Sequence, residues 1–223
     1  MSQYRGRLAP TPTGKLHLGH ARTFALAAQR AREAQGQLIY RTEDLDLARC
    51  KTEFTESAQT DLHWLGITWQ EGPDVGGPHA PYQQSLRGAF YLSIWQKLQA
   101  TGHLYPCEKS RQDVARSLQA PHAEDDREPI FPPELRPAIG SWSPTLEPGK
   151  TNWRFRVPDG QTISFYDALQ GPQSFVAGKD FGDFLVWRKD GFPSYELAVV
   201  ADDHAMDITE VVRGADLLLS TAR

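Results

Sequence analysis

The sequence predicts an α/β fold with a parallel sheet flanked by helices and a small inserted α+β part. In the first 64 residues, short apolar runs typical of strands alternate with longer runs of helical periodicity, the order of a parallel βαβ unit. From residue 151 onward, short alternating runs separated by Gly, Pro and Asp indicate antiparallel strands. With 223 residues, the chain is long enough to bury a sizeable core as one domain carrying an insertion.

The first part of the chain is expected to run strand, helix, strand, helix, helix. Its first helix is rich in Ala, Leu, Arg and Gln with apolar positions at helical spacing, and its second strand is the run QLIYR. Gly36 and Gly102 are expected to end the first and last of these helices. In chain order the expected elements are residues 4–9, 17–35, 37–41, 51–64 and 84–100.

The second part is expected to begin with a loop-like stretch, because residues 119–150 are rich in Pro, Asp, Glu and Gly. The runs WRFRV, TISFYD, SFVA and FLVWR then predict one small antiparallel sheet. The run YELAVVADDHAMDITEVVRGADLLL predicts a helix, a strand and the start of another helix. We therefore expect residues 1–101 and 178–223 to form the main domain and residues 102–177 an inserted subdomain.

Composition narrows the function classes. The net charge of -4 disfavours a general nucleic-acid coat, although a local basic face could still bind a phosphate backbone. The chain has two cysteines, no signal-peptide pattern at its start and no apolar run of membrane-spanning length. These features predict a cytoplasmic protein with no membrane partner.

The stretch LAPTPTGKLHLGHA, residues 8–21, lies where the first strand leads into the first helix. In parallel sheets, ligands bind beyond the carboxyl ends of strands, where helix N-termini attract anions. Gly14 is expected to adopt a backbone conformation closed to other residues, and His17 and His20 fall on neighbouring parts of one helical face. The two imidazoles could therefore hold one phosphate chain, or they could simply cap the helix. The residues alone leave both interpretations open.

Three motifs taken together resemble the signatures of class I glutamyl-type aminoacyl-tRNA synthetases: RLAPTPTGKLHLGH, RTEDLDLAR and VVRGADLLLST. The resemblance covers nearly the whole chain and implies a Rossmann-like catalytic domain with an inserted acceptor-binding-type subdomain. HLGH matches the HIGH motif of the family, which binds ATP and stabilises the transition state of adenylate formation. The third motif is most similar to the short glutamyl-Q tRNA(Asp) synthetase branch, which attaches glutamate to queuosine in tRNA(Asp).

The resemblance implies roles for single residues. His17 and His20 would be catalytic and would bind ATP, with Gly19 letting ATP lie close to the backbone. Two arginines, one carboxylate and one tyrosine hydroxyl complement glutamate, which has two carboxylates and one ammonium group. The residues implied for glutamate binding are Arg7, Ala9, Thr11, Glu43, Tyr195 and Arg213. Glu43 falls where a carboxylate receives the α-amino group, and which arginine takes which carboxylate stays open.

Each of these residues also has an ordinary structural interpretation. Singly, Arg7 and Arg213 would be surface charges, Glu43 with its neighbouring acids a solvated loop, and Tyr195 a core aromatic. The run DDH at residues 202–204 suggests a polar cluster near the site, but it more often marks an exposed turn.

The implied substrates are L-glutamate, ATP accompanied by Mg²⁺, and the queuosine of tRNA(Asp), and the implied oligomeric state is a monomer. Glutamyl-tRNA synthetases as a family need tRNA to activate glutamate, so activation without tRNA would favour the glutamyl-Q branch. One alternative is the catalytic fragment of a glutamyl-tRNA synthetase. Others are a non-catalytic module that binds ATP or an amino acid, and a nucleotidylyltransferase, which would leave Arg7 and Glu43 unexplained. Residues 109–116 (KSRQDVAR) are a candidate tRNA contact, or else an ordinary exposed helix face.

Two departures from the family pattern stand out. Many relatives bind zinc through Cys-X-Cys and a downstream Tyr-X-X-X-Cys, and here Lys109, Phe131 and Leu135 occupy the second, third and last of those positions, with Cys107 alone retained. One thiolate cannot make a tetrahedral structural site, so no zinc is expected. The KMSKS loop of the family would lie beyond Arg223. Either this is a truncated catalytic core, or the natural protein is a shortened form with weak or lost activation.

Overall fold

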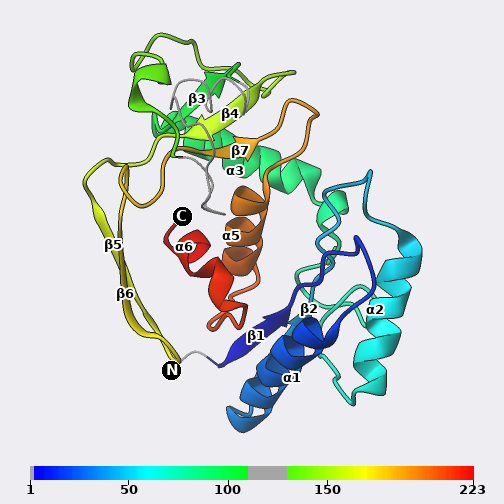
Figure 1. Ribbon diagram of the computed structural model, residues 1–223. Coiled ribbons are helices and arrows are strands. Elements are labelled where there is room, and N and C mark those ends of the chain that lie inside the picture. Colours follow the sequence, from blue (N-terminus) through cyan, green and yellow to red (C-terminus); the bar gives the residue numbers. More distant parts are fainter. Residues whose placement is uncertain (1–2, 110–129) are drawn as a thin grey trace. The chain divides into compact units, whose positions relative to one another are not determined.

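The computed structural model describes residues 3–109 and 130–223 (Figure 1). Two compact units share the chain. The first unit contains Met1–Tyr91 and Ala198–Ala215, and the second contains Leu92–Leu197 and Asp216–Arg223. The expected inserted subdomain of residues 102–177 stays a prediction.

The first unit begins as a parallel βαβ unit. Strand β1 (Arg5–Leu8) leads through a loop into helix α1 (Leu18–Glu33), and strand β2 (Gln37–Tyr40) then pairs in parallel with β1 (Figure 1). Arg5 lies opposite Gln37 and Leu8 opposite Tyr40. Helix α2 (Thr52–Trp64) follows. The predicted order of these four elements is confirmed.

Helix α1 packs on this sheet through one apolar face. Its buried residues Phe24, Ala27, Ala28 and Ala31 recur at intervals of three, one and three residues, the spacing of one helical stripe. Small alanines let the helix backbone approach the strands closely. The other buried members of this core are Leu8, Leu38, Tyr40, Leu62, Ile67 and Trp69.

Two helix ends differ from the prediction. Helix α1 ends at Glu33, before Gly36, and Gly36 is needed for another reason: an added Cβ would lie 2.4 Å from the carbonyl oxygen of Tyr4. The helix expected at 84–100 is broken into a 3-10 helix η1 (Gln84–Leu86) and an α-helix α3 (Gly88–Ala100). The break falls at Arg87, whose Nη1 donates to the carbonyl oxygens of His79 and Pro81 and so holds the chain there.

The described residues of the second unit form two small antiparallel sheets where one was predicted. Strands β3 (Leu104–Cys107), β4 (Asn152–Phe155) and β7 (Phe184–Trp187) form one of them, with β4 in the middle. Within residues 3–109 and 130–223, strands β5 (Thr162–Asp167) and β6 (Gly171–Val176) pair with each other alone, as a hairpin (Figure 1). The hairpin is joined by six residue pairs, from Thr162 opposite Val176 to Asp167 opposite Gly171. It is a two-stranded sheet distinct from the sheet of β3, β4 and β7.

The other elements match the prediction in part. Residues 130–150 are loop-like with one short 3-10 helix η2 (Pro133–Leu135), while residues 119–129 lie outside the described part of the chain. Helix α5 (Tyr195–Ala205) is present, and η3 (Ala215–Leu217) with α6 (Leu218–Ala222) confirms the last helix start. The strand expected between them is absent, because the amides of Thr209 and Glu210 both donate to the single carbonyl oxygen of Arg5, at 2.9 and 3.4 Å, and no ladder follows. None of the described helices is long and apolar enough to span a bilayer.

Cys107 lies among apolar side chains, which include Phe131 and Leu135 at two of the positions considered for zinc ligands. Tyr105, Cys107 and Phe131 form a buried cluster, against which Leu135 and Trp142 pack. Among the described residues, no group of three or more His, Cys, Asp or Glu side chains could hold a metal ion. We infer that packing stabilises this region, and the absence of zinc stays a prediction.

Replacing Phe131 with alanine is expected to lower the free energy of unfolding by about 3–5 kcal/mol, because it empties a fully enclosed aromatic site. Urea unfolding measures this change, and Leu146→Ala serves as a control because Leu146 is largely exposed. Chelator should leave the unfolding midpoint of the unsubstituted protein unchanged. One equivalent of zinc in the purified protein would contradict this account.

Candidate active site

Backbone hydrogen bonds fix the loop between β1 and α1. The amide of Glu43 donates to the carbonyl oxygen of Pro10 at 3.0 Å, and the amide of Lys51 donates to that of Pro12 at 3.0 Å. These bonds tie the segment after β2 to the carboxyl end of β1, with Ala9 half-buried and Thr11 exposed in the same loop.

The expectation for Gly14 is wrong, because its φ lies outside the left-handed region and an added Cβ would meet nothing within 4 Å. Prolines and cross-loop hydrogen bonds shape this turn, and the glycine is not required by it.

The two histidines of HLGH cap helix α1. His17 is the N-cap residue, and its Nδ1 accepts a hydrogen bond from the amide of Gly19 at 3.1 Å. Nδ1 of His20 accepts from the amide of His17 at 3.3 Å, which completes a reciprocal capping box. The rings stack with centroids 3.8 Å apart, and both are exposed. The structure therefore shows the capping role, while the phosphate-binding role stays a prediction.

Capping determines where the protons of these rings lie. A nitrogen that accepts from an N–H group carries no proton itself, so each neutral ring keeps its proton on Nε2. Each Nε2–H group remains a donor that can face an anion. Gly19 leaves room for this arrangement, because an added Cβ would lie 3.0 Å from Cε1 of His17. A capping role and a phosphate-binding role are thus compatible in the same side chain.

The capping box is expected to weaken in mild acid. Partial desolvation of the ring, and next the charge of His17, lower the pKa of His20 below its usual 6.5. The unfolded chain then binds more protons than the folded one, so this stability is complete above about pH 6.5 and is lost as the pH falls. The unfolding temperature should therefore drop between pH 7.5 and pH 5.5, by less in His20→Gln than in the unsubstituted protein or in the control His204→Gln. Equal drops in all three proteins would contradict this.

Arg41 lies at the centre of a buried ionic cluster in the first unit. Its side chain is 0% exposed. Nη2 donates to Oε1 of Glu43 at 2.9 Å, Nη1 donates to Oδ1 of Asp203 at 2.7 Å, and Nε lies 3.6 Å from Oδ2 of Asp202. Burial lowers the pKa of Arg41, but the three carboxylates raise it by more, so the guanidinium stays charged.

Arg7 joins the same cluster from β1. It is 5% exposed, and its Nε lies 3.3 and 3.4 Å from the two carboxylate oxygens of Asp203. Glu43 is 6% exposed. Neither residue is an ordinary surface charge. The structure thus brings together Arg7 and Glu43, two of the residues predicted to bind glutamate, and it connects them through Asp203 and Arg41.

The expectation that the DDH run is an exposed turn is wrong. It lies in helix α5, and Asp202 is 0% exposed, accepting hydrogen bonds from Gln84, Arg87 and Tyr91 at 2.8 Å each. Helical spacing could have revealed this, since Asp202 follows the fully buried Ala198 by four residues and shares its face.

Tyr195 and Arg213 belong to different units. Tyr195 is the exposed first residue of α5 in the second unit. Arg213 is half-buried in the first unit, directly after Val212, which packs against the core below β1 and β2. Their roles in glutamate binding, like those of Ala9 and Thr11, stay predictions.

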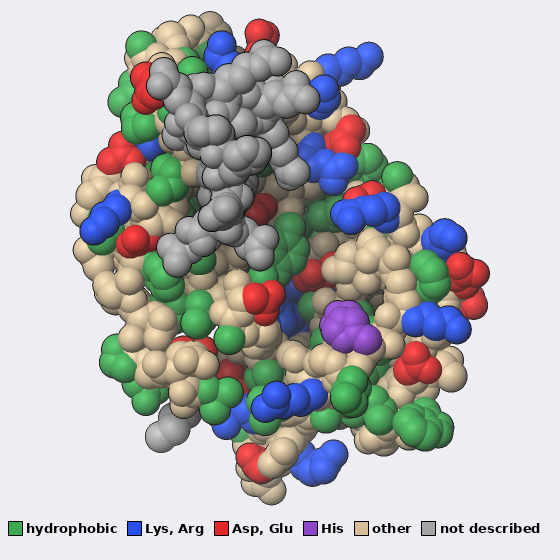
Figure 2. All heavy atoms as spheres, viewed as in Figure 1, with side chains coloured by type: hydrophobic (Ala, Val, Ile, Leu, Met, Phe, Trp, Pro, Cys, Tyr) green, Lys and Arg blue, Asp and Glu red, His purple; other side chains and the backbone are tan. Residues whose placement is uncertain are grey.

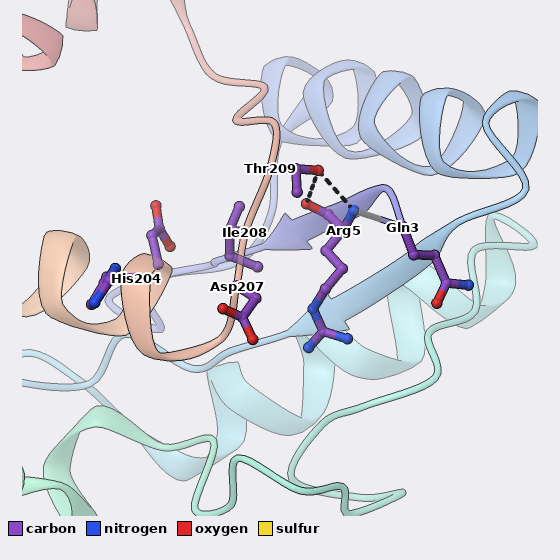
Figure 3. Close-up of a pocket in the computed structure, with 7 residues that line it drawn as sticks. Gln3, Arg5, His204, Asp207, Ile208 and Thr209 are labelled. Carbon is purple, nitrogen blue, oxygen red and sulfur yellow. Dashed lines mark hydrogen bonds between the residues drawn. The ribbon is translucent and has the colours of Figure 1, made fainter. Parts of the chain in front are cut away.

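A cavity of about 450 Å³ lies beside Arg5, the first residue of β1, and Asp203 of the ionic cluster is also on its wall (Figure 3). The backbone amide of Arg5 donates to Oγ1 of Thr209 at 2.9 Å on its wall. Ligands of parallel sheets bind at the opposite, carboxyl end of the strands, so we place the candidate site at the β1–α1 loop. The residues lining the cavity are Gln3, Arg5, Asp203, His204, Asp207, Ile208 and Thr209.

Surface charges give no further indication of a nucleic-acid site on the face drawn in Figure 2, where Lys, Arg, Asp and Glu side chains are interspersed. Of the candidate tRNA contact at 109–116, residues 110–116 lie outside the described part of the chain. That contact stays a prediction.

Comparison with known proteins identifies the class. The family model of tRNA synthetases class I (E and Q), catalytic domain, matches residues 3–223, and the chain belongs to this family of ligases. The predicted α/β synthetase fold is confirmed by a crystal structure of a glutamate tRNA ligase from Elizabethkingia meningosepticum in complex with its amino acid. The TM-score is 0.84 at 30% identity, over 99% of this chain and 45% of that one. This chain thus spans a little under half the length of that ligase.

Two relatives from Symbiobacterium thermophilum refine the comparison. The chain is 49% identical over 220 residues to its glutamyl-Q tRNA(Asp) synthetase, covering 98% of this chain and 68% of that protein. It is 40% identical over 216 residues to the glutamate–tRNA ligase of the same organism, covering 94% of this chain and 44% of that protein. The similarity to the glutamyl-Q protein is higher in both identity and coverage.

Proposed function

We propose that this chain activates L-glutamate with ATP and transfers it to the queuosine of tRNA(Asp). The observation that carries the proposal is the buried cluster that joins Arg7 to Glu43 behind the β1–α1 loop. It offers a guanidinium group for a carboxylate and a carboxylate for an ammonium group, in a chain of the class I synthetase family.

The proposed chemistry has two steps. An oxygen of the glutamate α-carboxylate attacks the α-phosphorus of ATP, pyrophosphate leaves, and a glutamyl-adenylate forms. A hydroxyl group of queuosine then attacks the activated carbonyl carbon, and AMP leaves. No side chain acts as a nucleophile, so the protein contributes alignment of the reactants and stabilisation of developing charge.

The histidine pair fits the phosphate part of this chemistry. The Nε2–H groups of His17 and His20 would donate to phosphate oxygens of ATP, and the start of helix α1 adds a favourable dipole. Mg²⁺ would accompany ATP, because phosphate oxygens are its usual ligands. We expect the enzyme to work in the cytoplasm as a monomer.

The similarity to relatives favours queuosine, and not the 3′ end of the tRNA, as the group that accepts glutamate. Within one organism, the glutamyl-Q protein is more similar to this chain than the glutamate–tRNA ligase is. The likeness to a solved glutamate tRNA ligase favours a second candidate, the catalytic part of a glutamyl-tRNA synthetase. A module that binds glutamate and ATP without turnover is the third.

Transfer of labelled glutamate separates these candidates. We expect label on tRNA(Asp) that contains queuosine, and none on the same tRNA made without queuosine or on tRNA(Glu). Label on tRNA(Glu) would favour the synthetase part. Binding of glutamate and ATP in a calorimeter, with no label on any of the tRNAs, would favour the binding module.

A further inference from the structure

Two acids that follow one another in α5 have different environments. Asp202 is 0% exposed, and its partners are Gln84, Arg87 and Tyr91 together with Arg41. The side chain of Asp203 is 19% exposed, and the side chains it contacts are Arg7 and Arg41. Asp202 therefore ties α5 to the segment from η1 to α3, while Asp203 connects two arginines of the candidate site.

The contacts form a continuous path between the two predicted ends of the glutamate site. Asp203 holds Nε of Arg7 on one side and Nη1 of Arg41 on the other. Arg41 then holds Oε1 of Glu43 through Nη2. Both substrate-facing groups keep atoms for a ligand, because the path uses only Nε of Arg7 and only Oε1 of Glu43.

We propose that Asp203 and Arg41 are positioning residues that fix Arg7 and Glu43 relative to each other, so that glutamate meets its carboxylate and ammonium partners at a set separation. This inference rests on the proposed function. Arg7 is a long side chain with many rotamers, and a charged partner at its Nε removes most of that freedom before the ligand binds. Arg41 is itself fixed by full burial and by three carboxylates.

A positioning role and a simple charge effect of Asp203 predict opposite changes in the affinity for glutamate when its charge is removed. Glutamate carries a net charge of about -1 at neutral pH. Removing the negative charge of Asp203 would by itself make the site more positive and strengthen binding of this anion. If Asp203 acts by orienting Arg7, its removal weakens binding instead. The direction of the change therefore distinguishes the two effects.

The test is Asp203→Asn in the full chain, with Asp207→Asn as the matched control. Asp207 is an exposed aspartate that lines the same cavity, and Asn tolerates its positive φ of 53°. We expect the Kd for L-glutamate, measured by calorimetry, to rise about tenfold or more in Asp203→Asn, as for a slightly misplaced binding group. The Kd for ATP should stay as in the unsubstituted protein, and Asp203→Glu should recover part of the loss. The unfolding temperature is expected to fall somewhat, because Asp203 is a charged partner of the buried Arg41, but Asn keeps an oxygen that can accept from Nη1 of Arg41.

Each outcome has one meaning. Weaker glutamate binding with unchanged ATP binding, in a protein that remains folded at the assay temperature, supports the positioning role. Equal or tighter glutamate binding in Asp203→Asn contradicts that role and leaves the proposed function intact. A matching loss for glutamate, ATP and stability also contradicts it, because it indicates a general structural role. Failure of the unsubstituted protein to bind glutamate contradicts the proposed function and the role together.

Discussion

Replacing Arg41 with methionine is expected to lower the free energy of unfolding by about 3–5 kcal/mol, the usual cost of leaving a buried charge without its partner. Methionine has a similar length but no charge, so it leaves the carboxylates of Glu43, Asp202 and Asp203 without the guanidinium that lies between them. Urea unfolding, monitored by tryptophan fluorescence, measures the change.

The control for this substitution is Arg49→Met. Arg49 is a largely exposed arginine whose partner is Asp46, and an exposed pair contributes about 1 kcal/mol or less. If Arg41→Met lowered the free energy of unfolding by less than about 1 kcal/mol, the three carboxylates would not need the guanidinium for stability. That result would also remove the basis for treating Arg41 as the centre of the site.

Replacing His17 with asparagine is expected to slow glutamate activation by about 10²–10³-fold, as when one donor to a developing negative charge is removed. Asparagine is among the best N-cap residues, so it should keep the capping bond to Gly19 while losing the Nε2–H group. His17→Ala should be as slow and should also lose about 1 kcal/mol of stability, the value of a cap.

Comparing these two variants separates the roles that the sequence left open. If activity survives in His17→Asn and is lost only in the less stable His17→Ala, then His17 acts as a helix cap alone. The control is Thr13→Ala, an exposed position in the same loop that bonds through its backbone amide to Thr11. It should change neither rate nor stability.

The sequence predicted the local elements of the first unit well and the pairing of the second unit poorly. Periodicity identifies α1 because its buried face recurs within one helix. The strand β3 was missed because its four residues include a proline and show no alternation. The split into two antiparallel sheets depends on which strands meet in space, which short alternating runs do not encode.

For the candidate site as well, features carried by local motifs could be predicted, and contacts between distant residues could not. Arg7, Glu43 and the histidine pair follow from motifs of adjacent residues. The pairing of Arg41 with Asp203 joins residues separated by 162 positions, so no local pattern reveals it. Arg41 was therefore absent from the predicted site, and Asp203 was named only as part of a polar run near it, although the two residues connect two members of the site.

Glutamate-dependent exchange of pyrophosphate into ATP, measured with and without tRNA, tests the central claim most directly. The account predicts exchange that requires glutamate, proceeds without tRNA and falls sharply in Arg7→Ala. Exchange that occurs only with tRNA would contradict the assignment to queuosine and favour a glutamyl-tRNA synthetase. No exchange under either condition would contradict glutamate activation by this chain.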